Sequence, residues 1–321
     1  MKKSKNEKLD ILFIGTALID SIIKSFDPKP ISASGYRAES GSLCIGGEAV
    51  NGAITAAKLK MNTGILCSLG QDNAGDMIIN ELVNHGVITD HIIRSQEHPT
   101  PVTTMFVSED GSRKSITNHS HMYNFHPEQY PQILKNAQAI VLGSLFRAPF
   151  NEPEVIKSVL NMAKKENTLI FADTKLPNFK VLSLNDIKES LPIIDYITPN
   201  EDEAKYYTGK TNPSEMADVF LSYGIKNVII KLGEKGCFFK NHEKSICLKA
   251  YNIDAKDATG AGDSFVAGFA SDLLLNNNLD SALRFANACG AICATAIGAG
   301  TALKSRDQVL RFIKDADNHY N

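Results

Sequence analysis

The stretch 257-DATGAGDSFVAGFA-270 is the most informative part of the sequence, because a row of small residues runs directly into the pattern of an amphipathic helix. Phe265, Phe269 and Leu273 recur at i, i+4 and i+8, which predicts a helix that begins near Gly262. The first N–H groups of a helix lack partners, and small residues there let an anion approach the backbone closely. The stretch therefore predicts an anion-binding helix start, with phosphate as the natural guest.

Asp263 lies in the first turn of this predicted helix. An isolated aspartate at that place is only a favourable partner for the helix dipole. Beside a phosphate site, however, its carboxylate is well placed to accept a proton from a hydroxyl that attacks the phosphate, so we expect Asp263 to be a general base. The stretch completes neither a Walker loop nor a G-x-G-x-x-G motif, in which Phe265 would have to be glycine. Both of those nucleotide-binding classes are disfavoured.

The composition narrows the choice of partner and compartment. The 321 residues carry 34 basic and 36 acidic side chains, and this balance favours neither nucleic acid nor an acidic membrane surface as a partner. The apolar run after the basic N-terminus is interrupted by charged residues and glycine, unlike a signal peptide or a membrane span. The six cysteines are scattered, as expected for free thiols in a reducing compartment. These features predict a cytoplasmic protein.

Strand-like and helix-like segments alternate along the chain. The run at 9–22 reads as a buried first strand that ends near Gly15, and the alternation continues to the C-terminus. Such repeats predict an α/β fold with three layers, in which helices cover both faces of a mostly parallel sheet. Two turn-rich stretches, at about 25–44 and 100–120, predict a small β lid or a subunit contact, and no linker divides residues 1–321 into separate domains.

Seven motifs in a fixed order make the whole chain similar to the ribokinase-like (PfkB-type) carbohydrate kinases. They are GTALIDSI, IGGEAVNGAITAAKL, SLGQDNAGD, DGSRKSI, TPNEDEA, KLGEKGC and DATGAGDSFVAGF. The resemblance implies a ribokinase-like fold and ATP-dependent phosphorylation of a sugar hydroxyl. It also implies that Asp263 is the catalytic base and that the N–H groups of Gly260, Ala261 and Gly262 stabilise the transferring phosphoryl group.

The same resemblance assigns sugar-binding residues. Their side chains or close backbone approach would hold the sugar hydroxyls, with Asp20 at the end of the first strand: Asp20, Gly46, Gly47, Asn51 and Arg113. From the residues alone, Asn51 would be an ordinary helix cap, Gly46-Gly47 an ordinary turn and Arg113 a solvated charge on a hairpin. Both interpretations stay open at this point.

The resemblance also assigns the nucleotide and metal sites. ATP would be bordered by the following residues: Asn200, Lys231, Gly233, Gly236 and Asn287. Glu203 would hold Mg²⁺ through water, which suits an ion that keeps most of its waters. Asp257 and Thr259 match positions that help bind K⁺ in many relatives, although Ala258 and Ala302 stand where a hydroxyl is often found. Without the family, Asn200 is simply a good N-cap.

Three functions fit these motifs. The first is a kinase for a fructose-like or related monosaccharide, because Glu48 stands where ribokinases carry a lysine. The second is a nucleoside kinase of the same fold, with Tyr123, Phe125 and Phe146 as candidate base-stacking residues. The third is a non-catalytic sugar sensor. If the lid segments pair between subunits, the protein is a homodimer.

Overall fold

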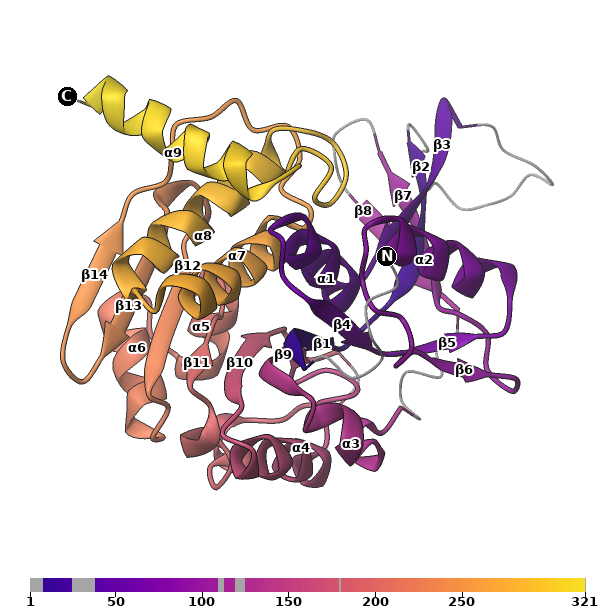
Figure 1. The fold of residues 1–321 in the computed structure, drawn as a ribbon, viewed down its shortest axis with the longest axis horizontal. Helices are drawn as coiled ribbons and strands as arrows, with labels where there is room; N and C mark the ends of the chain where they lie inside the picture. Colours follow the sequence, from indigo (N-terminus) through magenta and orange to yellow (C-terminus); the bar gives the residue numbers. More distant parts are fainter. Residues whose placement is uncertain (1–7, 25–37, 109–112, 119–124, 179, 321) are drawn as a thin grey trace.

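The computed structural model shows three layers, α/β/α, with a second, smaller sheet beside them (Figure 1). The structure describes residues 8–24, 38–108, 113–118, 125–178 and 180–320. In the described chain, the large sheet has eight strands, which follow one another in this spatial order: β14 (Ser245–Leu248), β13 (Cys237–Asn241), β12 (Asn227–Lys231), β11 (Tyr196–Ile197), β10 (Leu169–Thr174), β9 (Ala137–Leu145), β1 (Leu9–Ile14) and β4 (Thr63–Leu66). All pairs from β12 to β4 are parallel, and β13 and β14 add an antiparallel edge.

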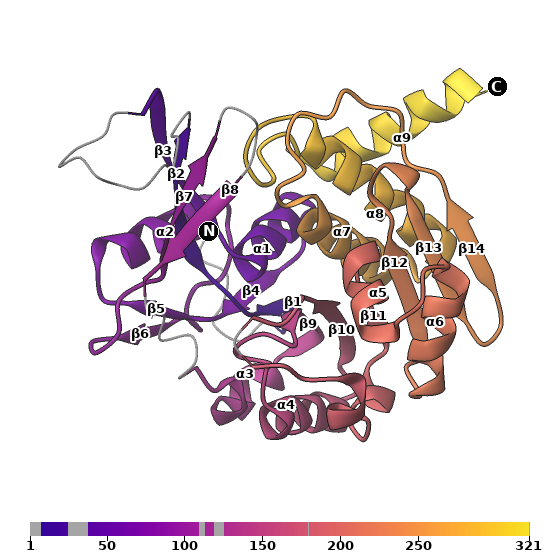
Figure 2. The ribbon, with the colours of Figure 1, turned by 180° about the vertical axis from the view of Figure 1, so that it is seen from behind.

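Two groups of helices cover the two faces of this sheet, as the views from in front and behind show (Figures 1 and 2). One face packs on these helices: α1 (Glu48–Lys58), α2 (Asn73–Asn84), α7 (Ala261–Asn276) and α8 (Leu279–Ala294). The other packs on these helices: α3 (Pro131–Leu134), α4 (Pro153–Lys165), α5 (Glu201–Thr208) and α6 (Pro213–Ser222). The last helix, α9 (Arg306–Tyr320), packs on α8 through a third apolar cluster. The predicted three-layer α/β fold is confirmed.

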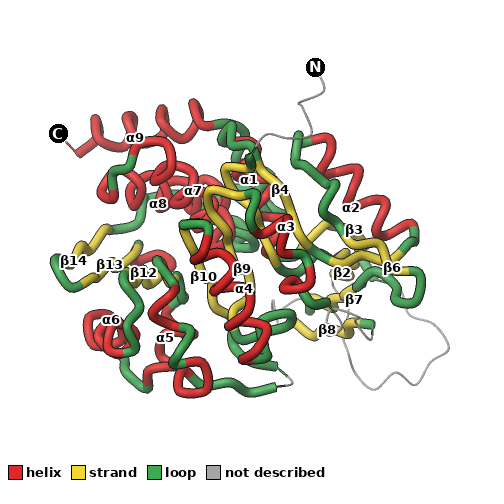
Figure 3. Tube along the Cα trace, turned by 60° about the horizontal axis from the view of Figure 1, so that its bottom comes forward, coloured by secondary structure: helices red, strands yellow, loops and turns green. Residues whose placement is uncertain are grey.

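Alternating side chains along the central strands explain this layering. Phe171 of β10 points into the cluster with α1 and α7, whereas Ile170 and Ala172 point into the cluster with α4, α5 and α6. Strands buried on both faces read as nearly continuous apolar runs, as β1 and β9 do in the sequence. Figure 3 shows the strands as a layer between the two sets of helices. Short 3-10 helices lie in the connections: η2 (Pro127–Gln129), η3 (Leu184–Ile187), η4 (Leu191–Ile193) and η5 (Gly233–Lys235).

The smaller sheet has the strand order β3 (Ser40–Gly46), β2 (Leu18–Lys24), β7 (Val102–Val107) and β8 (Arg113–Thr117). Its β2–β3 and β7–β8 pairs are antiparallel and its β2–β7 pair is parallel. The first strand ends at Ile14, next to Gly15 as predicted, and the rest of the run forms a second strand that enters the small sheet at Leu18. The segments predicted as the lid contain β3, β7 and β8 but not β2, and residues 25–37 lie outside the described chain.

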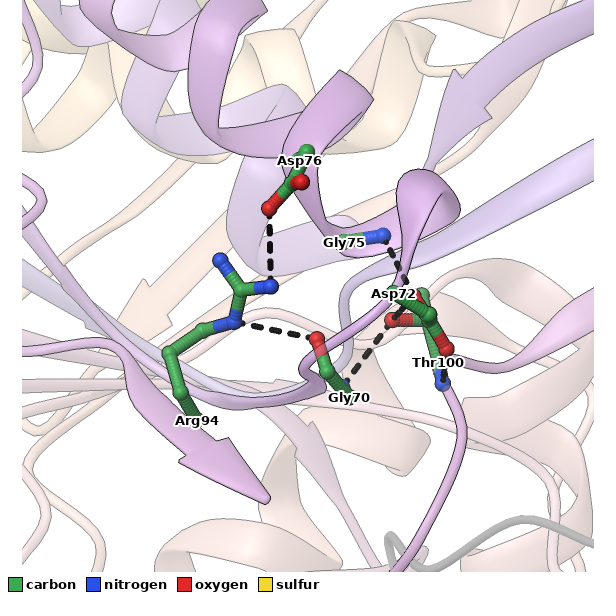
Figure 4. A network of polar contacts seen from close by, with 6 residues as sticks. All are labelled: Gly70, Asp72, Gly75, Asp76, Arg94 and Thr100. Atoms are coloured by element: carbon green, nitrogen blue, oxygen red, sulfur yellow. Dashed lines mark hydrogen bonds and ion pairs between the residues drawn. The ribbon is translucent and has the colours of Figure 1, made fainter. Parts of the chain in front are cut away.

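A polar network fastens the small sheet to the body of the protein (Figure 4). Asp72, the N-cap of α2, accepts hydrogen bonds from the Gly75 N–H at 2.8 Å, the Thr100 N–H at 2.7 Å and the Thr100 hydroxyl at 2.6 Å. The Thr100 hydroxyl oxygen in turn accepts the N–H of Gly70, from the short parallel pair of β5 (Ser68–Gly70) and β6 (Ile93–Ser95). Because Thr100 lies two residues before β7, this network holds the chain where it enters the small sheet.

Within the described residues, no helix has both the length and the apolar character that a membrane crossing requires.

Candidate active site

The starts of α1 and α7 meet at one edge of the large sheet, and their polar side chains touch. Asn51, in the first turns of α1, donates a hydrogen bond from Nδ2 to Oδ2 of Asp263 at 2.8 Å. The two residues are 212 positions apart in the sequence. Asn51 is not the cap of its helix, because Gly47 occupies the N-cap position. The carboxylate predicted as a base and the carboxamide predicted as a sugar ligand therefore lie side by side.

The start of α7 has open backbone donors. Its N-cap, Gly260, adopts a left-handed conformation (φ 76°) and offers no side-chain cap. A Cβ on Gly260 would lie 2.6 Å from Cβ of Ala299, so both the space and the backbone angle require glycine there. The Ala261 N–H donates to the Ala258 carbonyl, whereas no acceptor in the described chain binds the N–H of Gly262 or Asp263. An anion at this helix start would meet unpaired donors and the positive end of the dipole.

A pocket of about 620 Å³ opens directly in front of this helix start. Six of the predicted catalytic and nucleotide-binding residues line it: Lys231, Gly233, Gly236, Ala261, Gly262 and Asn287. Apolar groups from Ile253, Phe265 and Ala291 form much of the remaining wall. A concave, mainly apolar pocket of this volume with a few polar groups has the size and chemistry of a cofactor or nucleotide site.

Comparisons with known proteins identify the fold around this pocket. The model of the pfkB family of carbohydrate kinases matches residues 8–306. The chain belongs to this family. It is 29% identical to a ribokinase of Haemophilus influenzae, over 85% of this chain and 89% of that protein. It is 27% identical to the Arabidopsis thaliana protein named "Probable fructokinase-3", over 98% and 94% of the two chains.

Structural comparison agrees with the family assignment. A structure of Arabidopsis thaliana ribokinase complexed with ribose and ATP superposes with a TM-score of 0.85 at 26% identity, and it covers 96% of this chain and 99% of that one. The predicted membership of the ribokinase-like PfkB family is therefore confirmed. This pfkB protein is an ATP-dependent carbohydrate kinase.

The predicted nucleotide side of the site includes Lys231, which lines the pocket. Its ammonium lies 2.5 Å from Oδ1 of Asp173, which also accepts the Thr198 hydroxyl. A Cβ on Gly262 would lie 3.5 Å from the Lys231 Nζ, so this ammonium borders the open helix start. Asn287, also in the pocket wall, uses Nδ2 to donate to the Lys249 carbonyl at 2.7 Å. Lys231 and Asn287 thus each place a polar group in the wall of the pocket.

Asn200 and Glu203 lie behind Lys231 and do not line the pocket. Asn200 is the N-cap of α5, and it forms a reciprocal capping box with Glu203. The buried Glu203 carboxylate also accepts the Thr174 hydroxyl at 2.8 Å. Burial, together with the nearby negative charge of Asp173, raises the pKa of Glu203. A cation near these two carboxylates would relieve that cost, so the donor set is compatible with Mg²⁺ held through water.

The predicted sugar side follows β2 and β3 into α1. Asp20 lies in the middle of β2, so the expectation that it ends the first strand is wrong. Burial raises its pKa. A Cβ on Gly46 would overlap the Asp20 carboxylate, and a Cβ on Gly47 would overlap the Thr16 carbonyl, so both glycines permit close backbone approach. Asp20 and Gly46 therefore lie in contact, directly before the N-cap Gly47 of the helix that carries Asn51.

Asp257 and Thr259 organise the loop before α7. One oxygen of Asp257 accepts the N–H of Thr259 at 3.0 Å and its hydroxyl at 2.6 Å, and the other accepts the Gly298 N–H at 3.0 Å. The Cys293 thiol contacts the Thr259 carbonyl at 3.5 Å and accepts the Gly300 N–H at 3.3 Å. These contacts join the helix start to the 295–301 loop, where the family resemblance predicts a monovalent cation.

Two of the aromatic residues expected to stack on a nucleoside base are in the core. Phe146 is fully buried and stacks on Tyr207 with ring centroids 4.1 Å apart, and Phe125 is buried in the same cluster. Tyr123 lies outside the described residues. The stacking argument for a nucleoside substrate therefore fails at Phe125 and Phe146. Arg113 begins β8, and its side chain is also outside the described set.

Sequence reasoning missed how Glu48 is held, and it missed Lys175 entirely. The Glu48 carboxylate accepts the Thr16 N–H at 2.7 Å, and its side chain covers Gly15 and Gly143 at the ends of β1 and β9. Lys175 directly follows β10. The sequence signal that could have identified Lys175 is its position directly after a predicted strand, because ligands of α/β sheets bind beyond the carboxyl ends of parallel strands.

Proposed function

We propose that this kinase transfers the γ-phosphoryl group of ATP to a hydroxyl of a monosaccharide, with Asp263 as the general base. The observation that carries the proposal is the position of Asp263, in hydrogen-bond contact with Asn51 and at the open helix start that faces the pocket. A base must lie within reach of the proton that it removes, and an anion site must lie beside it for the phosphoryl group.

In the proposed reaction the sugar hydroxyl gives its proton to the Asp263 carboxylate. The sugar oxygen forms a bond to the γ-phosphorus as the bond from that phosphorus to the ADP oxygen breaks. The N–H of Gly262, unpaired within the described chain, with Gly260 and Ala261 beside it at the helix start, stabilises the negative charge on the transferring group. The sugar is held by Asp20, Asn51 and the backbone at Gly46-Gly47, with Arg113 as a further contact.

The nucleotide occupies the pocket beside α7 in this proposal. Lys231 and the turn residues Gly233 and Gly236 border its phosphates and ribose, and Asn287 lies near its base. Asn200 does not line the pocket, but the segment that carries it supports Lys231, because the Pro199 carbonyl accepts the Lys231 N–H at 2.9 Å. Glu203 would hold Mg²⁺ through water, and the ion would supply charge neutralisation to the phosphates. The loop of Asp257 and Thr259 would bind K⁺ beside the anion site.

A neutral, fructose-like monosaccharide is the proposed substrate. Glu48 stands in the position where ribokinases carry a lysine, and it lies on the same face of the sheet as Asp263. Carboxylates suit hydroxyl donors and repel acidic sugars. The relatives named above as ribokinase and fructokinase act on sugars of this kind by name, which supports the choice. A nucleoside substrate has lost two of the three stacking residues that favoured it, Phe125 and Phe146.

We also propose that the kinase works in the cytoplasm as a homodimer that pairs through its small sheet. Six free cysteines support the first statement, since thiols persist in reducing compartments. The exposed Leu43 and Ile116 of the small sheet, at 61% and 67% exposure, support the second. A monomeric mass by light scattering at micromolar concentration would contradict the dimer.

The test is ADP release measured by a coupled assay against a sugar panel, with and without K⁺. The panel contains fructose, ribose, 2-keto-3-deoxygluconate, fructose 1-phosphate, tagatose 6-phosphate, adenosine and inosine. Turnover on fructose or ribose supports the proposal. Turnover restricted to the acidic sugar, a sugar phosphate or a nucleoside overturns the proposed substrate class, and ATP binding without turnover on any of them favours the sugar-sensing alternative.

A further inference from the structure

Lys175 follows β10 at the edge of the sheet where the two helix starts meet. The Lys175 N–H donates to the Leu145 carbonyl at 3.0 Å, and its own carbonyl accepts the Tyr207 hydroxyl at 2.6 Å. The backbone just beyond the strand is therefore held from both sides. The neighbouring Thr174 points to Glu203, on the face of the sheet that α5 covers.

Alternation along β10 directs Lys175 to the opposite face. Phe171 packs edge-on against Phe269 of α7 at 5.9 Å, and Asp173, two residues on, pairs with Lys231 beside the start of α7. Side chains at i and i+2 share a face of a strand. Lys175 is the next member of this series, so its side chain lies on the face of α1 and α7, beyond Asp173 and toward the site.

The charges of four carboxylates act on the ammonium of this lysine. Burial opposes its charged form, but the attraction of Asp263, Asp173, Glu48 and Glu203 outweighs burial and raises the pKa of Lys175 above its ordinary value. The side chain is therefore an ammonium at neutral pH. Unlike Lys231, which lies 2.5 Å from Asp173, Lys175 has no carboxylate oxygen within 4.0 Å of its ammonium among the described residues. Several carboxylates attract its charge, but among the described residues none of them forms a close ion pair with it.

This placement answers a difficulty of the proposed reaction. A phosphoryl group that moves toward Asp263 carries negative charge into a region that already holds Asp263, Asp173 and Glu48. Coulomb repulsion in a partly buried site is several times stronger than in water. Lys231 is already paired with Asp173, so the backbone donors of α7 and the Lys175 ammonium are left to compensate that charge.

We propose that Lys175 is a further catalytic residue of this kinase, whose ammonium binds the phosphoryl group while it passes from ATP to the sugar oxygen. The inference rests on the proposed phosphoryl transfer at Asp263. Lys175 keeps its protons throughout: the hydroxyl proton goes to Asp263, the phosphorus–oxygen bond to ADP breaks, and the bond to the sugar oxygen forms. The role of Lys175 is electrostatic, and it is largest when charge on the transferring group is greatest.

The test compares K175M with K175R and with the matched control K157M. Lys157 is an exposed lysine on α4 that pairs with Glu189 at 3.4 Å, away from the site. We expect K175M to lower kcat by about 100-fold to 1,000-fold, the usual effect of losing one donor to a developing charge. The KM values for ATP and for the sugar should change by less than about threefold, because the contact forms in the transition state. K175R should recover part of kcat, and K157M should match the unaltered kinase.

A binding measurement separates this role from a structural one. Isothermal titration with MgADP alone should give similar affinities for K175M and the unaltered kinase. Titration with MgADP plus aluminium fluoride, which mimics the transferring phosphoryl group, should show at least about a tenfold loss for K175M, since transition-state analogues report contacts made in the transition state. If K175M fails to fold, as judged by its thermal transition, K175Q takes its place.

Three outcomes would overturn the inference. They are an unchanged kcat in K175M, an equal loss of affinity for MgADP with and without aluminium fluoride, and a rise in the sugar KM at constant kcat, which would make Lys175 a sugar ligand. The proposed function fails separately: if the unaltered kinase turns over no neutral sugar but still binds MgADP with aluminium fluoride through Lys175, the proposed substrate is wrong and the role of Lys175 stands.

Discussion

Helices α2 and α7 both carry the sequence alanine, glycine, aspartate in their first turn, and use it in opposite ways. In α2 the triplet is 74–76, and in α7 it is 261–263. The cap of α2 is Asp72, whose carboxylate accepts the Gly75 N–H and also binds Thr100, so the first donors of the helix are already occupied (Figure 4). The cap of α7 is Gly260, which has no side chain, and its helix start faces a pocket.

The difference teaches that the N-cap residue of each helix decides what the triplet does. An acidic cap satisfies its own helix and repels anions, whereas a left-handed glycine leaves the donors and the dipole available. The aspartates differ in the same way. Asp76 forms an exposed ion pair with Arg94 at 2.8 Å, while Asp263 contacts Asn51 at the pocket.

Exchanging each aspartate for asparagine should give the largest contrast between the two helix starts. D263N should lower kcat by at least about 100-fold, because the general base is lost. Affinities for MgADP and sugar should stay within about threefold. D76N removes only an exposed ion pair and should change neither kcat nor, beyond about 0.5 kcal/mol, the free energy of unfolding. Steady-state kinetics and urea titration measure both, and near-normal turnover by D263N would rule out Asp263 as the base.

Much of this contrast could be predicted from the sequence. The amphipathic pattern after Gly260 identified α7 and its glycine-capped start, because periodicity and glycine placement are local properties. The end of β1 near Gly15 could be predicted, but the separate strand β2 could not, since the apolar run continues beyond the turn at Gly15 and Thr16. Lys175 carries no motif, and its place beside Asp263 depends on strand alternation and on pairing with β9.

Substituting the two glycines with alanine should separate function from stability. A Cβ on Gly262 meets only the flexible Lys231 side chain at 3.5 Å, so G262A should keep its free energy of unfolding within about 0.5 kcal/mol. Its methyl group stands at the anion site, and kcat/KM for ATP should fall by about tenfold or more. A Cβ on Gly75 lies 2.5 Å from the Gly70 carbonyl oxygen and 2.9 Å from the Thr100 hydroxyl. G75A should therefore cost about 1–3 kcal/mol of stability.

Equal effects of G262A and G75A on both quantities would contradict the contrast. The assay for G75A is run well below its unfolding midpoint, so that a loss of folded protein is not read as a loss of turnover. Its kcat per folded molecule should match that of the unaltered kinase.

Removing the cap of α2 should have a smaller effect. D72A deletes the acceptor of the Gly75 N–H and of both Thr100 donors, and the loss of an N-cap costs about 1 kcal/mol, up to about 2. Urea denaturation gives the value. Because the same carboxylate fixes the start of β7, D72A should also raise the sugar KM more than the ATP KM if the small sheet covers the sugar. Unchanged stability would mean that water replaces the carboxylate at no cost.

The smallest effect is the dependence of the Asp72 contribution on pH. Burial disfavours the charged carboxylate, but its hydrogen bonds to Thr100 and Gly75 and the charge of Arg94 outweigh burial and lower the pKa of Asp72 below 3.8. A group whose pKa is lower in the folded state stabilises the fold fully above its unfolded pKa, and the stabilisation is lost as pH falls through the folded pKa.

The difference in unfolding free energy between the unaltered kinase and D72N should therefore be constant from pH 7 down to about 5 and shrink as the pH falls below about 3.8, the ordinary value for aspartate. D76N is the control, because Asp76 caps no helix and should show only the weaker, salt-screened dependence of an exposed ion pair. Urea titrations at a series of pH values measure both differences. If the D72N difference instead grew as the pH fell, the sign of the predicted pH dependence would be reversed. The Asp72 carboxylate would then not be stabilised by its role as a cap, and the contrast between the two helix starts would lose its physical basis.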